Sequence, residues 1–430
     1  MAVLPSASAA GTAIGIPWDD LRAIAGAEHL RSAGSADRVA GIQPQMVLEP
    51  DNETELAAAL RCADAAGMSV VPRGGGTKLG WGNRPVRADL ILSTARLNRV
   101  IEHAWADLTV SVEAGCTIQN LQNALSQHGQ HIAIDPLWPD RATIGGILST
   151  NDSGTLRIRY GALRDQIIGV TIALPDGTLA SSGGKVVKNV AGYDLPKLIT
   201  GALGTLGVIT RAIFRLHPLP HKVESFTFAA GDLDDANRLV LAVHNSRLAH
   251  TGLQARFSAQ MAPAVDIRFE GTDTGLAAQA DALRRLVAPA TITVACEEVW
   301  LARQELWSSA DPAAIAKISV LPTSVSETCG RISRLADSLG VKWGAVVQGT
   351  GLGWLRLVAS SAPAIHQVLQ TIRPELERLG GSLTVLHRPS AMPAMDTWGN
   401  CGNALPLMLS VKQQFDPHGT LNPGRFVGGI

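Results

Sequence analysis

The sequence predicts an α+β protein with more than one domain, and three observations support this. The chain has 430 residues, and at roughly 150 residues per domain two or three domains are expected. Strand-like and helix-like patterns alternate along the chain. Dense glycine loops crowd the first half and thin out after Pro220, where a second domain is expected to begin.

Composition excludes several classes of protein. Hydrophobic residues make up 46% and charged residues 17%, which favours a packed core over disorder. The 37 Lys and Arg residues balance the 37 Asp and Glu residues, so no net field draws the chain to nucleic acid or to an anionic membrane. Five cysteines without a C-x-x-C pair argue against a disulfide framework or an iron–sulfur site.

No apolar run reaches the length of a membrane span, and the first residues carry no early Lys or Arg as a signal peptide would. We expect a cytoplasmic protein that meets the inner face of the membrane only through partners.

The first predicted unit is a strand, a helix, a strand and a glycine loop. Met46–Glu49 is strand-like, and the spacing of Asn52 and Glu55 is that of a capping box. The helical face that follows ends at Gly67, a C′ residue by its position. After a short apolar strand at Met68–Pro72 comes the loop RGGGTKLGWGNRP.

The remaining elements follow the same patterns. They predict strands at Asp89–Ser93, Leu108–Glu113, Ile167–Leu174, Val208–Leu216, Glu224–Phe228 and Ala345–Gln348, and helices at Asp19–Ala27, Thr117–Gln127, Asp194–Thr200 and Asp281–Val287. Residues 135–161 are expected to be rich in loops, and no repeat of fixed period is visible. We expect a flexible N-terminal segment at 1–35, one domain at 36–220, a second at 221–385 and a C-terminal segment at 386–430.

The first glycine cluster, Gly74–Gly76, suggests an anion site. Successive residues with positive φ can aim their N–H groups at a diphosphate. Arg73 would add charge unless it pairs with a nearby acid. A Rossmann fingerprint needs a helix after the loop, which Pro85 precludes, and Lys78 is misplaced for a P-loop. A glycine-rich surface turn is the alternative.

The second cluster combines small and short polar residues: Thr143, Gly145, Gly146, Ser149, Asn151, Ser153, Gly154, Tyr160 and Gly161. Small side chains let the backbone approach a flat or extended ligand. Tyr160 and Tyr193 are the only tyrosines in the chain, and packing with a bonded hydroxyl is the alternative role for each.

The third cluster, Gly201–Gly207, precedes a strand, which is the wrong order for a nest at a helix N-terminus. Lys185, Lys188 and Lys197 lie just upstream. They would supply positive potential near a phosphate or flavin, or form a solvated face.

Histidines offer no clear base. His128 and His131 form H-x-x-H without a third ligand nearby, so a metal site is not expected. A histidine could act as a general base, but nothing in the sequence singles one out.

Taken together, seven motifs resemble the PCMH-type FAD-binding domain of the flavoprotein family that includes vanillyl-alcohol oxidase and the D-lactate and glycolate oxidases. They are P-R-G-G-G-T at 72–77, D-P at 135–136, A-T-I-G-G at 142–146, N-D-S-G at 151–154, R-Y-G at 159–161, G-A-L-G-T-L-G-V-I-T at 201–210 and F-D-P-H-G-T-L-N-P-G-R at 415–425. The chain is most similar to the branch of FAD-binding E subunits of bacterial glycolate oxidase, because of R-G-G-G-T-K-L-G-W-G, K-N-V-A-G-Y-D-L-P-K-L and a short cap region.

The resemblance implies a fold and a cofactor site. Two α+β subdomains, about 36–100 and 101–220, would hold FAD, an α+β cap domain would follow, and the tail would return to the FAD domain through Asn422 and Arg425. The residues implied for FAD are Pro72, Arg73, Gly74, Gly75, Gly76, Thr77, Pro136, Thr143, Gly145, Gly146, Ser149, Asn151, Ser153, Gly154, Tyr160, Gly161 and Ile209.

Two departures from the family pattern bear on the chemistry. Many relatives carry a histidine bonded covalently to the flavin where this chain has Thr77, so non-covalent FAD is expected. Many active relatives also carry a Glu in the third glycine motif and a His-rich motif in the cap, and this chain has neither.

The function implied is that of an FAD-binding subunit of a glycolate oxidase complex. It would help to oxidise glycolate to glyoxylate and pass electrons through flavin, with a sister FAD subunit and an iron–sulfur subunit as partners. Two alternatives remain: a self-sufficient, D-lactate-like 2-hydroxy-acid dehydrogenase, and a structural subunit stabilised by FAD. The cap has charged residues such as Arg256 and Arg268 but no His-centred cluster, so we expect little glycolate oxidation by the isolated chain.

Overall fold

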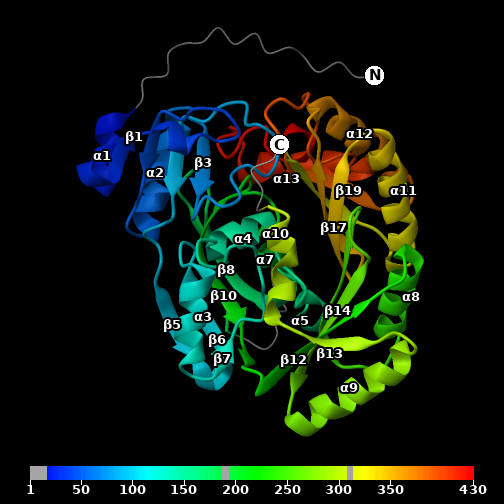
Figure 1. Cartoon of the computed structure of the whole chain (residues 1–430). Coiled ribbons are helices and arrows are strands. Elements are labelled where there is room, and N and C mark those ends of the chain that lie inside the picture. Colours follow the sequence, from blue (N-terminus) through cyan, green and yellow to red (C-terminus); the bar gives the residue numbers. More distant parts are fainter. Residues whose placement is uncertain (1–16, 186–192, 308–312) are drawn as a thin grey trace.

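The computed structural model describes residues 17–185, 193–307 and 313–430, and four sheets organise this part of the chain. The first has the order β1-β2-β4-β3, from β1 (Leu30–Ser32), β2 (Met46–Leu48), β4 (Leu90–Ser93) and β3 (Val70–Arg73). Strands β2, β4 and β3 are parallel, and α2 (Glu53–Ala65) connects β2 to β3 (Figure 1).

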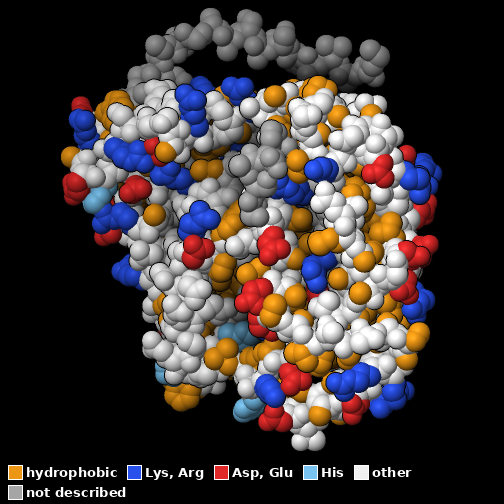
Figure 2. Space-filling view, in the orientation of Figure 1, with side chains coloured by type: hydrophobic (Ala, Val, Ile, Leu, Met, Phe, Trp, Pro, Cys, Tyr) orange, Lys and Arg blue, Asp and Glu red, His pale blue; other side chains and the backbone are white. Residues whose placement is uncertain are grey.

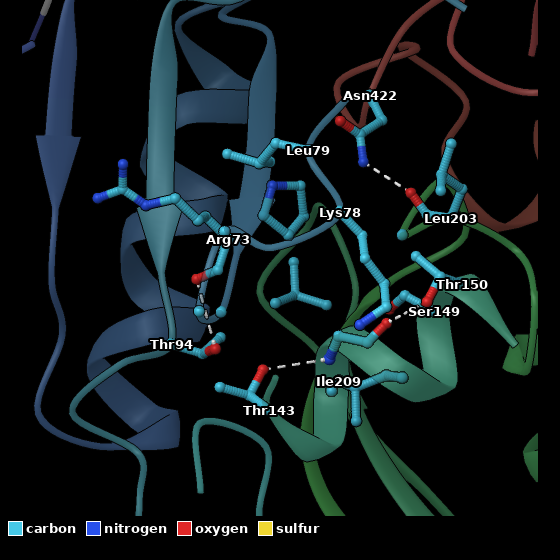
Figure 3. Close-up of a pocket in the computed structure, with 18 of the residues that line it drawn as sticks. Arg73, Lys78, Leu79, Thr94, Thr143, Ser149, Thr150, Leu203, Ile209 and Asn422 are labelled. Atoms are coloured by element: carbon cyan, nitrogen blue, oxygen red, sulfur yellow. Dashed lines mark hydrogen bonds between the residues drawn. The ribbon is translucent and has the colours of Figure 1, made fainter. Parts of the chain in front are cut away.

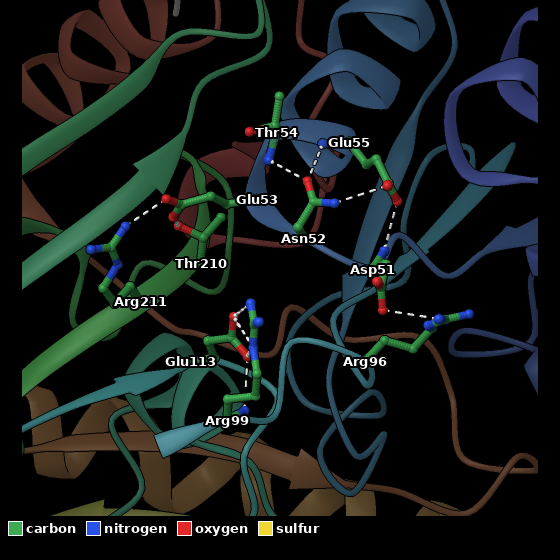
Figure 4. Close-up of polar contacts among 10 residues, drawn as sticks. All are labelled: Asp51, Asn52, Glu53, Thr54, Glu55, Arg96, Arg99, Glu113, Thr210 and Arg211. Atoms are coloured by element: carbon green, nitrogen blue, oxygen red, sulfur yellow. Dashed lines mark hydrogen bonds and ion pairs between the residues drawn. The ribbon is translucent and has the colours of Figure 1, made fainter. Parts of the chain in front are cut away.

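The start of α2 confirms the predicted cap. The Asn52 side chain accepts hydrogen bonds from the backbone N–H groups of Thr54 and Glu55, and Glu55 accepts one from the backbone N–H of Asp51 (Figure 4). These contacts satisfy donors that a helix start otherwise leaves unpaired. Gly67 follows the helix with a φ of +66°, as its C′ position predicts.

The prediction of a flexible segment at 1–35 is wrong for residues 17–35. Helix α1 (Trp18–Ala25) packs on α2, and β1 pairs with β2 in antiparallel register. Leu21 of α1 is fully buried. Apolar packing and strand pairing therefore order this stretch, while residues 1–16 lie outside the described part.

The second sheet is antiparallel, with the order β5-β6-β10-β8-β9. Its strands are β5 (Val100–Ala104), β6 (Thr109–Glu113), β10 (Val208–Arg215), β8 (Ile167–Ala173) and β9 (Leu179–Gly183). Helices α3 (Ile118–Ser126) and α4 (Ile144–Thr150) share a core with this sheet. Short helices at α5 (Arg157–Tyr160), α6 (Leu163–Gln166) and α7 (Leu195–Ile199), and a β7–β11 pair (Gln130–His131 with His217–Pro218), complete the unit.

Helix α4 lies inside the stretch that the sequence predicted to be loop. Thr143 caps its start by accepting a hydrogen bond from the N–H of Gly146, 3.3 Å away, and Asn151 ends it in a left-handed conformation. Gly145 and Gly146 lower helix propensity, but burial of Ile144, Ile147 and Leu148 outweighs that cost.

Residues 222–387, which we call the cap, form one eight-stranded antiparallel sheet of order β15-β12-β14-β13-β17-β18-β16-β19. The strands are β12 (Lys222–Ala229), β13 (His250–Ser258), β14 (Ala264–Gly271), β15 (Ile292–Ala295), β16 (Ala313–Ser319), β17 (Lys342–Gln348), β18 (Leu352–Val358) and β19 (Ser382–His387). The helices α8 (Leu233–His244), α9 (Asp273–Val287), α11 (Val325–Ser338) and α12 (Ala362–Arg378) cover its outer face (Figure 1).

The cap consists of two units with the same topology. β12-α8-β13-β14-α9-β15 and β16-α11-β17-β18-α12-β19 each follow the β-α-β-β-α-β order, and β13 pairs with β17 to join them. The repeat is one of topology, which explains why the sequence shows no fixed period. Short helix α10 (Ala302–Glu305) lies in the connection between the units.

The cap sheet has an apolar and a polar face. Ala314, Ala316 and Ile318 of β16 belong to the core beneath the helices, so Ile315 and Lys317 alternate onto the opposite face. That face is directed at the first two sheets and their helices (residues 17–220, which we call the FAD-side unit), because Trp354 of β18 clusters with Trp81 and Leu137. Side chains of both charges are interspersed over the surface shown in Figure 2, in keeping with the balanced composition.

The C-terminal segment returns to the first sheet, as predicted. After α13 (Leu405–Phe415), the backbone N–H of Val70 donates to Thr420 O at 2.7 Å, and the N–H of Asn422 donates to Val70 O at 2.9 Å. The Asn422 side chain donates to Leu203 O. The α+β fold with a returning tail is therefore as the sequence predicted. None of the helices in the described ranges has the length and apolarity needed to span a bilayer.

Candidate functional site

A cavity of about 680 Å³ lies between the first two sheets, and loops from both form it. Its walls are 72–79 after β3, Thr143 to Thr150 at α4, 203–209 before and within β10, and Asn422 and Arg425 of the tail (Figure 3). Backbone and small side chains make up much of this wall, which leaves many N–H groups near the surface of the cavity.

Close approach of two loops shapes the cavity. A Cβ on Gly74 would overlap the Thr143 hydroxyl, and a Cβ on Gly75 would overlap the carbonyl oxygen of Arg141. Of the three glycines only Gly76 has a positive φ, +70°. The expectation that successive positive-φ residues build the nest is therefore wrong. Gly74 and Gly75 are required because the loops touch.

The residues present fit the diphosphate of FAD. The cavity is lined by several glycines, and Arg425 in its wall keeps its buried Nε without a hydrogen-bond partner in the described ranges. Arg425 also donates to the carbonyl oxygens of Leu79 and Trp81, so the tail fixes the end of the glycine loop. Burial lowers the pKa of Arg425 to about 10.

The structure brings most of the predicted FAD residues together. Those that line the cavity are Pro72, Arg73, Gly74, Gly75, Gly76, Thr77, Thr143, Gly145, Gly146, Ser149 and Ile209. Pro136 and Gly154 line a second cavity, described below. Asn151, Ser153, Tyr160 and Gly161 line neither, although Asn151 Oδ1 and Ser153 Oγ are buried without a partner.

Tyr160 and Arg73 have other partners than a cofactor. The Tyr160 hydroxyl donates to Glu270 Oε2 of the cap at 2.7 Å, in line with the packing alternative. The Arg73 guanidinium points away from the cavity (Figure 3) and binds Asp37 Oδ1 at 2.6 Å. Hydrogen bonds from Arg31 and then Arg73 hold the pKa of Asp37 well below its usual value. Arg73 therefore contributes mainly to holding the loop.

Sequence reasoning missed several lining residues: Lys78, Leu79, Thr94, Thr150, Leu203, Gly204, Gly207 and Val208. The third glycine cluster, Gly201–Gly207, could have indicated some of them. Its order of helix, glycines and strand argued against an anion site there, so these residues were not predicted. Of the three lysines upstream, Lys185 pairs with Glu102 and Lys197 with Asp194, as a solvated face would. Lys188 lies outside the described residues, as does most of the K-N-V-A-G-Y-D motif.

A buried group of three charges, which we call the charge bridge, joins the FAD-side unit to the cap. Asp152 Oδ2 lies 3.1 Å from Lys78 Nζ, and Asp152 Oδ1 lies 3.0 Å from Arg303 of α10. All three side chains are at most 8% exposed. Burial alone would raise the pKa of Asp152, but Arg303 and Lys78 hold it below its usual value, so the carboxylate stays ionised.

The second cavity, of about 1080 Å³, lies between α3, the 134–139 segment and the polar face of the cap sheet. Arg303 lines it and Lys78 lines the first cavity, so the charge bridge lies between the two cavities. Three buried side-chain atoms of its lining have no hydrogen bond in the described ranges: both amide atoms of Gln348 and Trp354 Nε1. Buried polar atoms are rarely left unpaired in a folded protein, and a polar ligand in this cavity would satisfy them.

Lys317 is a part-buried cation beside this cavity. It stands on the polar face of β16, in register with Trp354, which lines the cavity. No hydrogen bond or ion pair joins it to any residue in the described ranges, and Asp152, Arg157 and Arg303 are the charged groups that act on it. Burial lowers its pKa to about 8, although Asp152 opposes the shift.

Histidine does not line either cavity in the described ranges. His131 packs on Tyr160 and His217, and His387 lies against Trp307, 6.1 Å between ring centroids. Those same ranges hold no group of three His, Cys, Asp or Glu residues placed to bind a metal ion. A catalytic base therefore stays unassigned.

Comparison with known proteins bears on both cavities. The sequence profile of the FAD binding domain family matches residues 44–183, which contribute to the walls of both. The matched segment is similar to that domain. Its residues form the glycine loop, the Thr143–Thr150 wall and the border with the cap, and FAD is the cofactor of the chain.

Two relatives extend the likeness. The glycolate oxidase subunit GlcD of Bacillus subtilis is 34% identical over 197 residues, which cover 46% of this chain and 42% of that protein. The D-2-hydroxyglutarate dehydrogenase of Xanthomonas citri pv. viticola is 27% identical over 425 residues, which cover 89% of each chain. The chain thus spans less than half of the first relative and most of the second.

The fold beyond the FAD-binding domain also has a solved counterpart. p-Cresol methylhydroxylase with substrate bound superposes with a TM-score of 0.77 at 15% identity and covers 95% of each chain. At this identity the likeness establishes the fold alone. It confirms the predicted architecture of FAD-binding domain, cap and returning tail.

Gly75→Val should abolish FAD retention while leaving the cap folded. The branched side chain would push the loop off Arg141 and so open the wall of the cavity. Flavin absorbance per purified chain measures retention, and circular dichroism measures folding. Gly80→Ala is the control, because a Cβ there meets no atom within 4 Å. Equal FAD content in Gly75→Val and the native chain would contradict the site.

Acid precipitation should leave the flavin in the supernatant. Thr77 lines the cavity and cannot form the histidine–flavin bond found in many relatives of the family. The measurement is the flavin absorbance of supernatant and washed pellet. Flavin that stays with the pellet would mean a covalent link through another residue.

Proposed function

We propose that this chain is an FAD-dependent oxidoreductase that acts on the CH–OH group of a 2-hydroxy acid. The observation that carries the proposal is Lys317, a part-buried cation that no carboxylate of the described residues pairs with, beside a cavity close to the FAD site. A carboxylate is the ligand that such a cation lacks. Relatives named for glycolate and D-2-hydroxyglutarate support the same substrate class.

The proposed reaction removes two electrons and two protons from the substrate. The C–H and O–H bonds of the alcohol break, and a C=O bond forms. Bound FAD supplies the acceptor for the hydride, and the hydroxyl proton leaves to a base or to water. Lys317 would hold the substrate carboxylate, and the walls of the second cavity would fix the α-carbon toward the FAD site.

The finer proposal is that the chain serves as an FAD-binding subunit of a glycolate oxidase complex. A sister FAD subunit and an iron–sulfur subunit would receive the electrons, as the sequence resemblance implies. The absence of a histidine from both cavities, within the described residues, supports a role that needs a partner for full turnover. The nearly full-length likeness to a dehydrogenase keeps a self-sufficient enzyme as the second candidate.

Lys317→Met should raise KM for a 2-hydroxy acid about 10- to 100-fold, because a hydrogen bond to a charged group contributes roughly 1.5–3 kcal/mol. The charged form of Lys317 is lost as pH rises through about 8, so KM of the native chain should rise above that pH. Lys317→Arg should keep the low KM and remove the rise. Lys342→Met, on an exposed position of β17, is the control. An unchanged KM in Lys317→Met would place the carboxylate elsewhere.

Rapid mixing with glycolate separates the two candidates. The FAD-loaded chain alone should bleach little of its oxidised flavin absorbance, and the sister FAD subunit should restore bleaching. Bleaching by the isolated chain at the rate of the whole complex would instead establish the self-sufficient enzyme.

A further inference from the structure

Lys78 is a buried cation at the end of the glycine loop. It lines the FAD cavity, and its side chain runs from the loop toward α4 (Figure 3). Its Nζ pairs with Asp152 and lies 3.3 Å from Leu137 O, to which it donates. The rings of Trp81 and Trp138 lie 5.8 and 5.4 Å from Nζ. Aromatic rings and burial keep this charge away from water.

The junction of the two cavities carries more positive than negative charge. Asp152 is shared by Lys78 and Arg303, so one carboxylate faces two cations. Lys317 adds a third cation, with which no carboxylate of the described residues pairs. Asp135 adds a second carboxylate, which accepts hydrogen bonds from the backbone N–H groups of Gly154 and Thr155, so three cations face two carboxylates. In a buried site such an excess acts on any ligand with little screening.

The charge bridge marks where the flavin ring would lie, and this step rests on the proposed function. If the substrate occupies the second cavity, the ring must border both cavities for a hydride to pass. Lys78, Asp152 and Arg303 form that border. Two-electron reduction of FAD with uptake of one proton adds one negative charge to the ring. Nearby cations therefore stabilise the reduced cofactor, and a nearby carboxylate destabilises it.

We propose that Lys78 raises, and Asp152 lowers, the reduction potential of the bound FAD. Lys78 would act through its positive charge and not by contact with the substrate. Asp152 would partly offset that charge, and it also links Lys78 to Arg303 of the cap. The reduction potential of the flavin would then depend on a contact between the FAD-binding domain and the cap. It would change if the cap moved away from the FAD-binding domain.

A purely structural role predicts something different. If the bridge only joined two domains, loss of either partner would leave a buried charge unpaired, so both variants would lose stability. Neither would then shift the potential in a direction set by the sign of the charge removed. The direction of the shift is therefore the decisive readout.

The experiment is a spectroelectrochemical titration of the FAD-loaded full chain without substrate. Lys78→Met should lower the two-electron midpoint potential by about 30 mV or more, a tenfold change in the equilibrium. Asp152→Asn should raise it by a similar amount, and Lys78→Arg should keep the native value. Lys412→Met is the matched control, since Lys412 is a part-buried lysine that likewise pairs with an aspartate, Asp416 at 2.5 Å, but lies outside both cavity walls.

Shifts of the same sign in Lys78→Met and Asp152→Asn, or shifts no larger than in the control, would overturn the proposal. If Lys78→Met fails to retain FAD, the upward shift in Asp152→Asn still decides it. The titration needs no substrate, so opposite shifts in a chain that oxidises no 2-hydroxy acid would refute the proposed function alone. Oxidation of the acid with an unmoved potential would refute this inference alone.

Discussion

The carboxylate of Asp152 is the contact on which the arrangement of the two halves depends. It accepts from Lys78 on the glycine loop and from Arg303 on the cap, at 3.1 and 3.0 Å, in a place that water does not reach. Loss of one member of a buried ion pair typically costs about 3–5 kcal/mol, because the remaining charge is left unpaired. The same contact stands between the FAD cavity and the second cavity. The Asp152 side chain therefore links the position of the cap to the electrostatic environment of the cofactor.

Backbone contacts provide the rest of the cofactor site. The glycine loop touches the segment before α4 so closely that Gly74 and Gly75 leave no room for a Cβ. The tail holds the loop from the other side, where Arg425 donates to the carbonyl oxygens of Leu79 and Trp81. The cap contributes the polar face of an amphipathic sheet, whose other face is covered by helices. The function we propose depends on that polar face, because Lys317 lies on it and pairs with no carboxylate in the part of the chain that the structure describes.

Local signals in the sequence predicted much of the fold and part of the site. The Asn52 cap and the strands β2, β3, β4, β6, β8 and β10 follow short-range patterns that the sequence displays, and the family resemblance implied the returning tail. Contacts between residues far apart in the sequence could not be predicted from such patterns. The N-terminal strand is ordered by pairing with β2, and the eight-stranded sheet depends on pairing of β13 with β17. Arg303 and Lys317 lie 151 and 165 positions from Asp152 in sequence, so no motif could connect them.

The central claim is that FAD and a 2-hydroxy acid meet at the charge bridge. A structure of the FAD-loaded chain with a bound 2-hydroxy acid tests it most directly. The account predicts the diphosphate against the glycine loop and Thr143, the flavin ring beside Lys78 and Asp152, and the substrate carboxylate within ion-pair distance of Lys317 Nζ. A flavin ring directed away from the cap, or a carboxylate bound without Lys317, would contradict it.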